Sequence, residues 1–174
     1  VAEGLAQAGA ALILNGSNPE RLTTAATSLR TKGHTVHEAP FDVTDETAVQ
    51  AAFDHLDARG IEVDILFNNA GIQLRRPLVD LNATDWRHVI ETNLTSAFLV
   101  GREAARRMIA RGKGGKIINT GSLTSAVARA TTGPYTAAKG GIKMLTQAMT
   151  AEWAEHNIQV NAIGPGYMLT EMTQ

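Results

Sequence analysis

Tyr135 and Lys139 are the residues of this 174-residue chain whose types and spacing most directly suggest chemistry. They stand four positions apart, after Pro134, which suits the first turn of a helix because its missing N–H would be unsatisfied there anyway. Residues four apart on a helix project from the same face, so the phenol and the ammonium would lie side by side. Ser122, thirteen residues before Tyr135 at the end of a strand-like segment, brings a hydroxyl to the pair.

The chemistry that this group suggests is proton transfer by an activated tyrosine. A nearby positive charge favours the phenolate, so Lys139 can bring the phenol pKa from its reference of about 10 toward neutrality. A drop of ~3 units requires ~4 kcal/mol of differential stabilisation, more than one exposed ammonium supplies in water. Burial of the site or a second charge from a cofactor is therefore implied. The alternative is that Tyr135 is an aromatic residue at a helix start and Lys139 a solvated surface cation.

The composition predicts one soluble domain, residues 1–174, that binds a small molecule. Hydrophobic residues make up 44% of the chain, and 16 Lys and Arg against 17 Asp and Glu leave a net charge of −1, so no bulk field attracts nucleic acid or a membrane surface. The absence of cysteine excludes disulfides and thiolate chemistry, and the five histidines show no metal-ligand spacing. We see no signal peptide and no apolar run near eighteen residues, which makes a cytoplasmic protein the default expectation.

Helix-like and strand-like segments alternate along the chain. This alternation predicts a three-layer, doubly wound α/β fold of the Rossmann type, in which helices cover both faces of a parallel sheet. Expected helices span residues 1–8, 19–31, 45–59, 85–111 and 134–156, and expected strands span 11–14, 35–39, 63–67, 116–119 and 158–163.

In such sheets, ligands bind beyond the carboxyl ends of the strands. The residues expected there are Asn15 to Ser17, Asp42, Asn68 to Gly71, Ser122, and Gly164 to Gly166. Small and amide side chains therefore gather where a ligand should lie. Asn and Gly also favour simple turns, so each motif taken alone has a second explanation.

Several single residues leave two interpretations open. Asp42 either caps the following helix or hydrogen-bonds an adenine amino group. Asn93, in the middle of a helix, either faces solvent or bonds something specific, such as a proton-relay water. Arg75, Arg76 and Arg129 are either solvated loop cations or grip a substrate carboxylate through two parallel hydrogen bonds.

The chain opens with a helix that feeds a strand, and no G-x-G-x-x-G occurs at its start. A doubly wound dinucleotide fold begins with a strand, a glycine-rich turn and a helix. We therefore expect the first strand and the phosphate-binding turn to precede Val1, and the closing elements to follow Gln174.

Taken together, Asn68-Asn69-Ala70-Gly71, Asn93, Ser122, Tyr135-x-x-x-Lys139 and Pro165-Gly166 resemble the short-chain dehydrogenase/reductase family over nearly the whole chain. Within that family the chain looks most like gluconate 5-dehydrogenases. The resemblance implies hydride transfer between a nicotinamide cofactor and a secondary alcohol or ketone, with D-gluconate and 5-keto-D-gluconate as the leading pair. The alternatives are a 3-ketoacyl-thioester or other sugar-acid reductase of the same family, and a non-catalytic scaffold that binds a dinucleotide.

The resemblance also implies roles for single residues. Tyr135 would be the general acid/base, Ser122 would orient the substrate oxygen, Lys139 would activate Tyr135 and hold the nicotinamide ribose, and Asn93 would support a relay water. Cofactor contacts would come from Asn15, Ser17, Asp42, Val43, Asn69, Ala70, Gly71, Pro165, Gly166 and Thr170, together with Tyr135 and Lys139. Substrate contacts would come from Arg76, with Arg75 or Arg129 as substitutes, and from Ser122 and Tyr135.

The residues after the first strand bear on the choice of cofactor. A carboxylate there would accept the ribose 2′-OH and repel a 2′-phosphate, whereas Asn15-Gly16-Ser17 carries none. We therefore expect NADP in preference to NAD. By resemblance alone, the chain should assemble as a homodimer or homotetramer.

Overall fold

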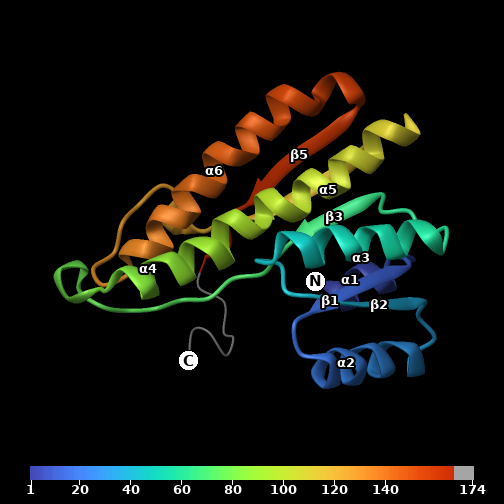
Figure 1. Ribbon diagram of the computed structural model, residues 1–174, viewed down its shortest axis with the longest axis horizontal. Coiled ribbons are helices and arrows are strands. Elements are labelled where there is room, and N and C mark those ends of the chain that lie inside the picture. The colour runs from blue at the N-terminus through green and yellow to red at the C-terminus, as the bar shows by residue number, and fades with distance from the viewer. Residues whose placement is uncertain (167–174) are drawn as a thin grey trace.

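Helices and strands alternate in the computed structural model (Figure 1), which describes residues 1–166. The helices are α1 (Ala2–Gln7), α2 (Pro19–Thr31), α3 (Glu46–Ala58), α4 (Ala83–Ile90), α5 (Ser96–Arg111) and α6 (Gly133–Trp153). The strands are β1 (Leu12–Gly16), β2 (Val36–Pro40), β3 (Ile65–Asn68), β4 (Gly115–Thr120) and β5 (Ile158–Ile163). Every expected segment is present, with ends within a few residues of those expected.

All strand pairs are parallel, which confirms the expected α/β class. The strands form two hydrogen-bonded groups rather than one continuous sheet: β1 pairs with β2, and β4 lies between β3 and β5. Within residues 1–166 no strand pairs with the second edge of β1 or of β3, so the hydrogen-bond ladder is interrupted between them. The three-strand group ends, at the carboxyl ends of its strands, in Asn68 to Gly71, Ser122, and Gly164 to Gly166, three of the groups expected to border a ligand.

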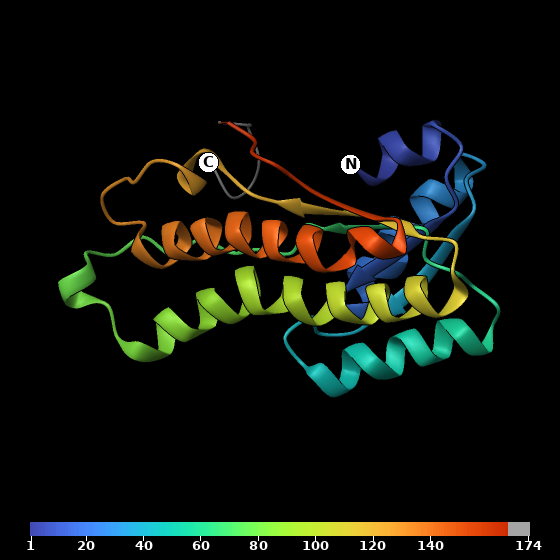
Figure 2. The same ribbon diagram turned by 90° about the horizontal axis from the view of Figure 1, so that it is seen from above.

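The helices lie in layers on the two sides of the strands. Figure 2 shows α1 and α2 on one side and α3, α5 and α6 on the other, as a doubly wound fold requires. The main core lies between α3, α5, α6 and the three-strand group, and is built from Val49, Phe53, Leu99, Met108, Ile117, Met149 and Val160, among others. A smaller core, which includes Leu12, Ala26 and Val36, joins α1 and α2 to the two-strand group.

Helix starts follow the capping residues that the sequence provides. Asn18 caps α2 by accepting a hydrogen bond from the Arg21 backbone N–H at 2.9 Å, and Asp45 caps α3 through the Ala48 N–H at 3.0 Å. The expected helix over 85–111 begins slightly earlier, at Ala83, and contains a π-helical turn, Glu91–Thr95, between α4 and α5. No helix in the described part of the chain is both long and apolar enough to cross a membrane.

Candidate active site

The first turns of α6 place Tyr135 and Lys139 together. The helix begins at Gly133, and Pro134 lies buried in its first turn. The Lys139 Nζ lies 5.6 Å from the centroid of the Tyr135 ring, so the two side chains share one face of α6 as their spacing predicts.

Lys139 is a buried lysine and not a surface cation. Its side chain is only 3% exposed, and its Nζ donates a hydrogen bond to the Thr120 carbonyl at 2.6 Å. Burial lowers the pKa of Lys139 from 10.5 to about 8, because removing water from the ammonium disfavours the charged form. The low-dielectric environment that the sequence argument required is therefore present.

Ser122 follows β4 and lies two residues after Thr120, the residue that holds Lys139. It caps a 3-10 turn, Leu123–Ser125, that packs against α6. The Ser122 Oγ accepts a hydrogen bond from the Thr124 N–H at 3.2 Å, and its own N–H donates to the Ser125 Oγ at 3.1 Å. The end of β4 thus fixes both Ser122 and the anchor of Lys139.

Asn93 is buried in the π-helical turn, so the solvent-facing interpretation of this residue is wrong. Its Oδ1 accepts from the Ile72 N–H and its Nδ2 donates to the Ile72 carbonyl, both at 2.7 Å. A Cβ built on Gly71 would come 3.2 Å from the Asn93 Oδ1 and 3.9 Å from the Lys139 Nζ. Gly71, Asn93 and Lys139 therefore meet at one point beside α6.

Three polar side chains that the sequence interpretation did not select lie beneath this cluster: Asn119, Thr120 and Thr146. Asn119 accepts from the Asn68 Nδ2 at 2.9 Å and donates to the Thr146 Oγ1 at 3.0 Å. The sequence feature that could have revealed Asn119 is its place in a strand-like segment, directly after the apolar Ile117 and Ile118.

Asn15, Ser17, Asp42 and Val43, expected to meet the adenosine half of a cofactor, lie at the carboxyl ends of β1 and β2. The Asn15 Nδ2 donates to the carbonyls of Ala39 at 3.0 Å and of Phe41 at 2.9 Å, and so ties β1 to the chain that follows β2. Ser17 is exposed, and Val43 packs against the main core.

Asp42 does not cap α3, because Asp45 does. Instead, its Oδ1 accepts from the Thr44 N–H at 2.9 Å and from the Thr44 hydroxyl at 2.8 Å. These two hydrogen bonds, the backbone one first, lower the pKa of Asp42 and keep it ionised. Its contact with adenine stays a prediction.

Asn69, Ala70 and Gly71, expected on the adenosine-ribose side, directly follow β3; Asn69 and Ala70 are exposed and Gly71 is half-buried. Pro165 and Gly166, expected on the nicotinamide side, lie after β5. A Cβ on Gly166 would come 3.8 Å from the Leu123 side chain, and one on Gly164 would come 3.6 Å from the Ser122 carbonyl, so the loop that contains Pro165 borders the Ser122 turn. Thr170 lies outside the described residues.

Two hydroxyl groups without a hydrogen-bond partner belong to residues on either side of Ser122 in the sequence. Within the described part of the chain, the Thr120 and Thr124 hydroxyl oxygens are buried without a hydrogen-bond partner. Such groups are rare in folded proteins and often mark a place for a ligand or an ordered water.

The arginines considered for a substrate carboxylate differ in their surroundings. The Arg76 Nη1 pairs with the Asp85 Oδ2 at 3.0 Å, and the Arg76 N–H donates to the Thr131 carbonyl at 2.9 Å. Arg76 is therefore already engaged by a carboxylate of this chain. Arg75 and Arg129 are exposed on their loops.

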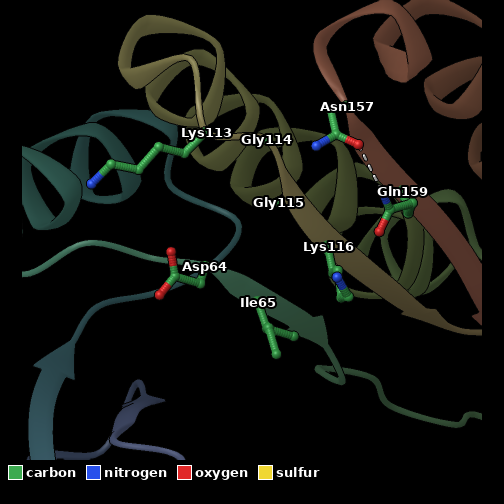
Figure 3. Close-up of a pocket in the computed structure, with 8 residues that line it drawn as sticks. All are labelled: Asp64, Ile65, Lys113, Gly114, Gly115, Lys116, Asn157 and Gln159. Carbon is green, nitrogen blue, oxygen red and sulfur yellow. Dashed lines mark hydrogen bonds between the residues drawn. The ribbon is translucent and has the colours of Figure 1, made fainter.

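A pocket of about 260 Å³ lies at the opposite end of the three-strand group (Figure 3). Its lining includes Asp64 and Ile65 at the start of β3, Lys116 at the start of β4 and Gln159 at the start of β5. It faces the amino ends of the strands, whereas Ser122 and Lys139 lie at the carboxyl end, so it is not the site described above. Residues 1–166 contain no group of three or more His, Asp or Glu that could hold a metal ion.

The chain matches the family model for short chain dehydrogenases over residues 1–174. It belongs to the short-chain dehydrogenase family. The expected family and fold class are thereby confirmed, and the chain is an NAD(P)-dependent oxidoreductase whose cofactor is NADP or NAD.

Sequence relatives cover the whole of the chain. Gluconate 5-dehydrogenase of Gluconobacter oxydans is 44% identical over 174 residues, which are 100% of this chain and 68% of that protein. The 5-keto-D-gluconate 5-reductase of Escherichia coli shows the same identity and the same coverage.

Solved structures of short-chain dehydrogenases superpose closely. A gluconate 5-dehydrogenase from Burkholderia cenocepacia in complex with NADP and tartrate is 46% identical with a TM-score of 0.96, over 99% of this chain and 68% of that one. A structure from Agrobacterium tumefaciens is 61% identical with a TM-score of 0.96, over 98% of this chain and 67% of that one.

Proposed function

We propose that this oxidoreductase interconverts D-gluconate and 5-keto-D-gluconate with NADP as its preferred cofactor. The observation that carries the catalytic part is the buried Lys139, held by the end of β4 and lying 5.6 Å from the Tyr135 ring. The choice of substrate is supported by the names of two relatives that are 44% identical over the whole chain.

In the proposed reaction, Tyr135 exchanges a proton with the substrate oxygen at carbon 5. The Ser122 hydroxyl hydrogen-bonds that oxygen and orients it, and the Lys139 ammonium stabilises the phenolate that Tyr135 becomes during ketone reduction. When bound, the nicotinamide supplies the hydride to the carbonyl carbon and takes it back in the oxidation.

Asn93 takes part chiefly by holding the loop after β3. With its Oδ1 and one Nδ2 hydrogen engaged by Ile72, the side chain keeps its second N–H and the second lone pair of its Oδ1 to hold a relay water. We propose that a water at this position passes protons between Lys139 and solvent.

For the cofactor, we propose contacts with Asn15, Ser17, Asp42, Val43, Asn69, Ala70, Gly71, Pro165 and Gly166. The preference for NADP is supported by the exposed end of β1, where Asn15, Gly16 and Ser17 offer no carboxylate against a 2′-phosphate. For the substrate carboxylate, Arg75 is now a better candidate than Arg76, which pairs with Asp85, and Arg129 stays a candidate.

The test uses the full-length protein that contains this chain. NADPH absorbance is followed with 5-keto-D-gluconate, with an acetoacetyl thioester and with a panel of other ketones, and NADH replaces NADPH in parallel. We expect 5-keto-D-gluconate to be reduced fastest and NADPH to be preferred.

The Tyr135→Phe variant should lose on the order of 100-fold or more in kcat, the usual effect of losing a general acid/base. Faster reduction of the thioester would contradict the proposed substrate. Full activity of Tyr135→Phe would contradict the proposed mechanism.

A further inference from the structure

Resting on the proposed function, we infer that the buried hydrogen-bonded chain Asn68–Asn119–Thr146 sets the position of α6 on β4 and so positions Tyr135 and Lys139 for turnover. Asn119 and Thr146 touch neither the phenol nor the ammonium. They act through the helix and are positioning residues.

The chain of hydrogen bonds crosses the layers of the fold. The Asn68 Nδ2 at the end of β3 donates to the Asn119 Oδ1 on β4 at 2.9 Å and to the Ala97 carbonyl on α5 at 3.3 Å. The Asn119 Nδ2 donates to the Thr146 Oγ1 on α6 at 3.0 Å. Two amides and one hydroxyl therefore link the two strands and two helices that surround the site.

Each hydrogen bond between Asn68, Asn119 and Thr146 fixes which atom of the next side chain donates and which accepts. The Thr146 hydroxyl donates to the Ile142 carbonyl at 2.7 Å, so it can only accept from Asn119. Asn119 must then turn its Nδ2 to α6 and its Oδ1 to β3, where the Asn68 Nδ2 supplies the matching donor. Asn119 is 0% exposed and Thr146 7% exposed, so water cannot replace a lost partner cheaply.

Two members of this hydrogen-bonded chain, Asn119 and Thr146, lie on the same strand and the same helix as the anchor of Lys139. Asn119 directly precedes Thr120, whose carbonyl accepts the hydrogen bond from Lys139 at 2.6 Å. Thr146 lies seven residues, or about two helical turns, after Lys139 on the same side of α6. Thr120–Lys139 and Asn119–Thr146 are thus two successive hydrogen bonds between β4 and α6.

The surrounding core cannot set this position by itself. Ile117, Ile142 and Met149 are buried at the same interface, but apolar contacts are non-directional and tolerate small shifts of a helix along a sheet. A satisfied buried polar network specifies one arrangement. A misplacement of about 1 Å can cost on the order of 100-fold in rate, so the position of α6 matters for catalysis even at constant stability.

Thr150 provides a matched control one turn further along α6. Its Oγ1 lies 2.7 Å from the Thr146 carbonyl oxygen and 2.8 Å from the Val160 carbonyl oxygen on β5, and its single O–H can donate to either of them. It has the same side chain on the same helix, but its contact is to β5 and not to the strand that carries Ser122.

The experiment compares Thr146→Val, Thr146→Ser and Thr150→Val in the full-length enzyme, with the ketone that the wild type reduces fastest. We expect kcat of Thr146→Val to fall by about 10- to 100-fold with KM within about twofold, and the pH–rate profile to shift because Lys139 moves relative to Tyr135. Thr146→Ser should restore kcat to within about threefold of wild type, and Thr150→Val should stay near it. Equal losses in Thr146→Val and Thr150→Val would overturn the inference.

A double variant, Asn119→Leu/Thr146→Val, separates positioning from stability. It replaces the Asn119–Thr146 pair by two apolar groups, a change that can be nearly neutral for folding, and leaves the Asn68 Nδ2 with the Ala97 carbonyl as its acceptor. We expect a melting temperature near that of the wild type and a kcat as low as that of Thr146→Val. A kcat equal to that of the wild type in this stable variant would overturn the inference. If the wild-type enzyme does not reduce 5-keto-D-gluconate but reduces another ketone, only the proposed substrate is contradicted.

Discussion

Burial of Lys139 makes its charge sensitive to pH. Its pKa in the folded protein is about 8, against 10.5 for an exposed lysine. Below pH 8 the folded and unfolded chains both carry the proton, and the folded chain bears the whole cost of desolvation. Between pH 8 and pH 10.5 the folded chain has released its proton while the unfolded chain still holds it. Stability from this group therefore rises with pH, by ~3 kcal/mol over the whole window.

Lys139→Met should remove this dependence. Relative to the variant, the wild type should gain on the order of 1 kcal/mol in unfolding free energy between pH 7 and pH 9, measured by urea unfolding without added cofactor. Lys143→Met, an exposed lysine one turn along α6, is the control and should run parallel to the wild type. If Lys139→Met also runs parallel to the wild type, Lys139 is not a desolvated lysine.

At the scale of single residues, spacing predicted the grouping of Tyr135 and Lys139 because helical geometry fixes which side chains are neighbours four positions apart. Spacing gives no information on burial, so the sequence could not decide whether Lys139 is buried or is a solvated surface cation. The sequence did not single out Asn119, because the role of an amide in an apolar strand becomes clear only when its partner on another element is known.

At the scale of elements, the π-helical turn Glu91–Thr95 is the feature that sequence periodicity could not reveal. The apolar pattern over 85–111 fits one continuous helix, and one turn of different hydrogen bonding leaves that pattern almost unchanged. The turn directs Asn93 inward to the backbone of Ile72. Such turns are frequent at functional sites, and this one ties the loop after β3 to the helix beside Lys139.

Asn93→Ala should test this clamp. It removes two hydrogen bonds and leaves the Ile72 N–H and carbonyl without their partner, so we expect a loss of about 2–4 kcal/mol in unfolding free energy. Hydrogen exchange at Ile72 should become faster because the loop opens locally.

Asn82→Ala is the matched control for the clamp. Asn82 caps α4 through the Asp85 N–H at 2.7 Å, and loss of a cap costs about 1 kcal/mol without an effect on Ile72. Unchanged exchange at Ile72 in Asn93→Ala would show that other contacts hold the loop.

At the scale of the whole molecule, the alternation of helices and strands predicted the parallel architecture because parallel strands need crossover helices. The relatives extend further than this chain, which aligns with 68% of the length of the gluconate 5-dehydrogenase of Gluconobacter oxydans.

The outer surfaces of α5 and α6 are the basis for a proposed homodimer or homotetramer. The two helices lie side by side (Figures 1 and 2) and expose large apolar side chains, with Phe98 41% and Met144 60% exposed. Exposed apolar groups on packed helices are typical of protein contacts, and a two-fold dimer would bury the same surface on both copies.

Met144→Glu places a charge at each of two symmetry-related positions of such a dimer, so we expect it to lower the molar mass in light scattering toward that of a smaller species. Val79→Glu makes the same kind of change at a side chain that is 93% exposed on the loop between β3 and α4, and should leave the mass unchanged. Because both variants add one carboxylate, a general effect of charge would act on both alike. An unchanged mass for Met144→Glu would place the contact between copies on another surface, whereas a fall in mass for Val79→Glu alone would place it at that loop.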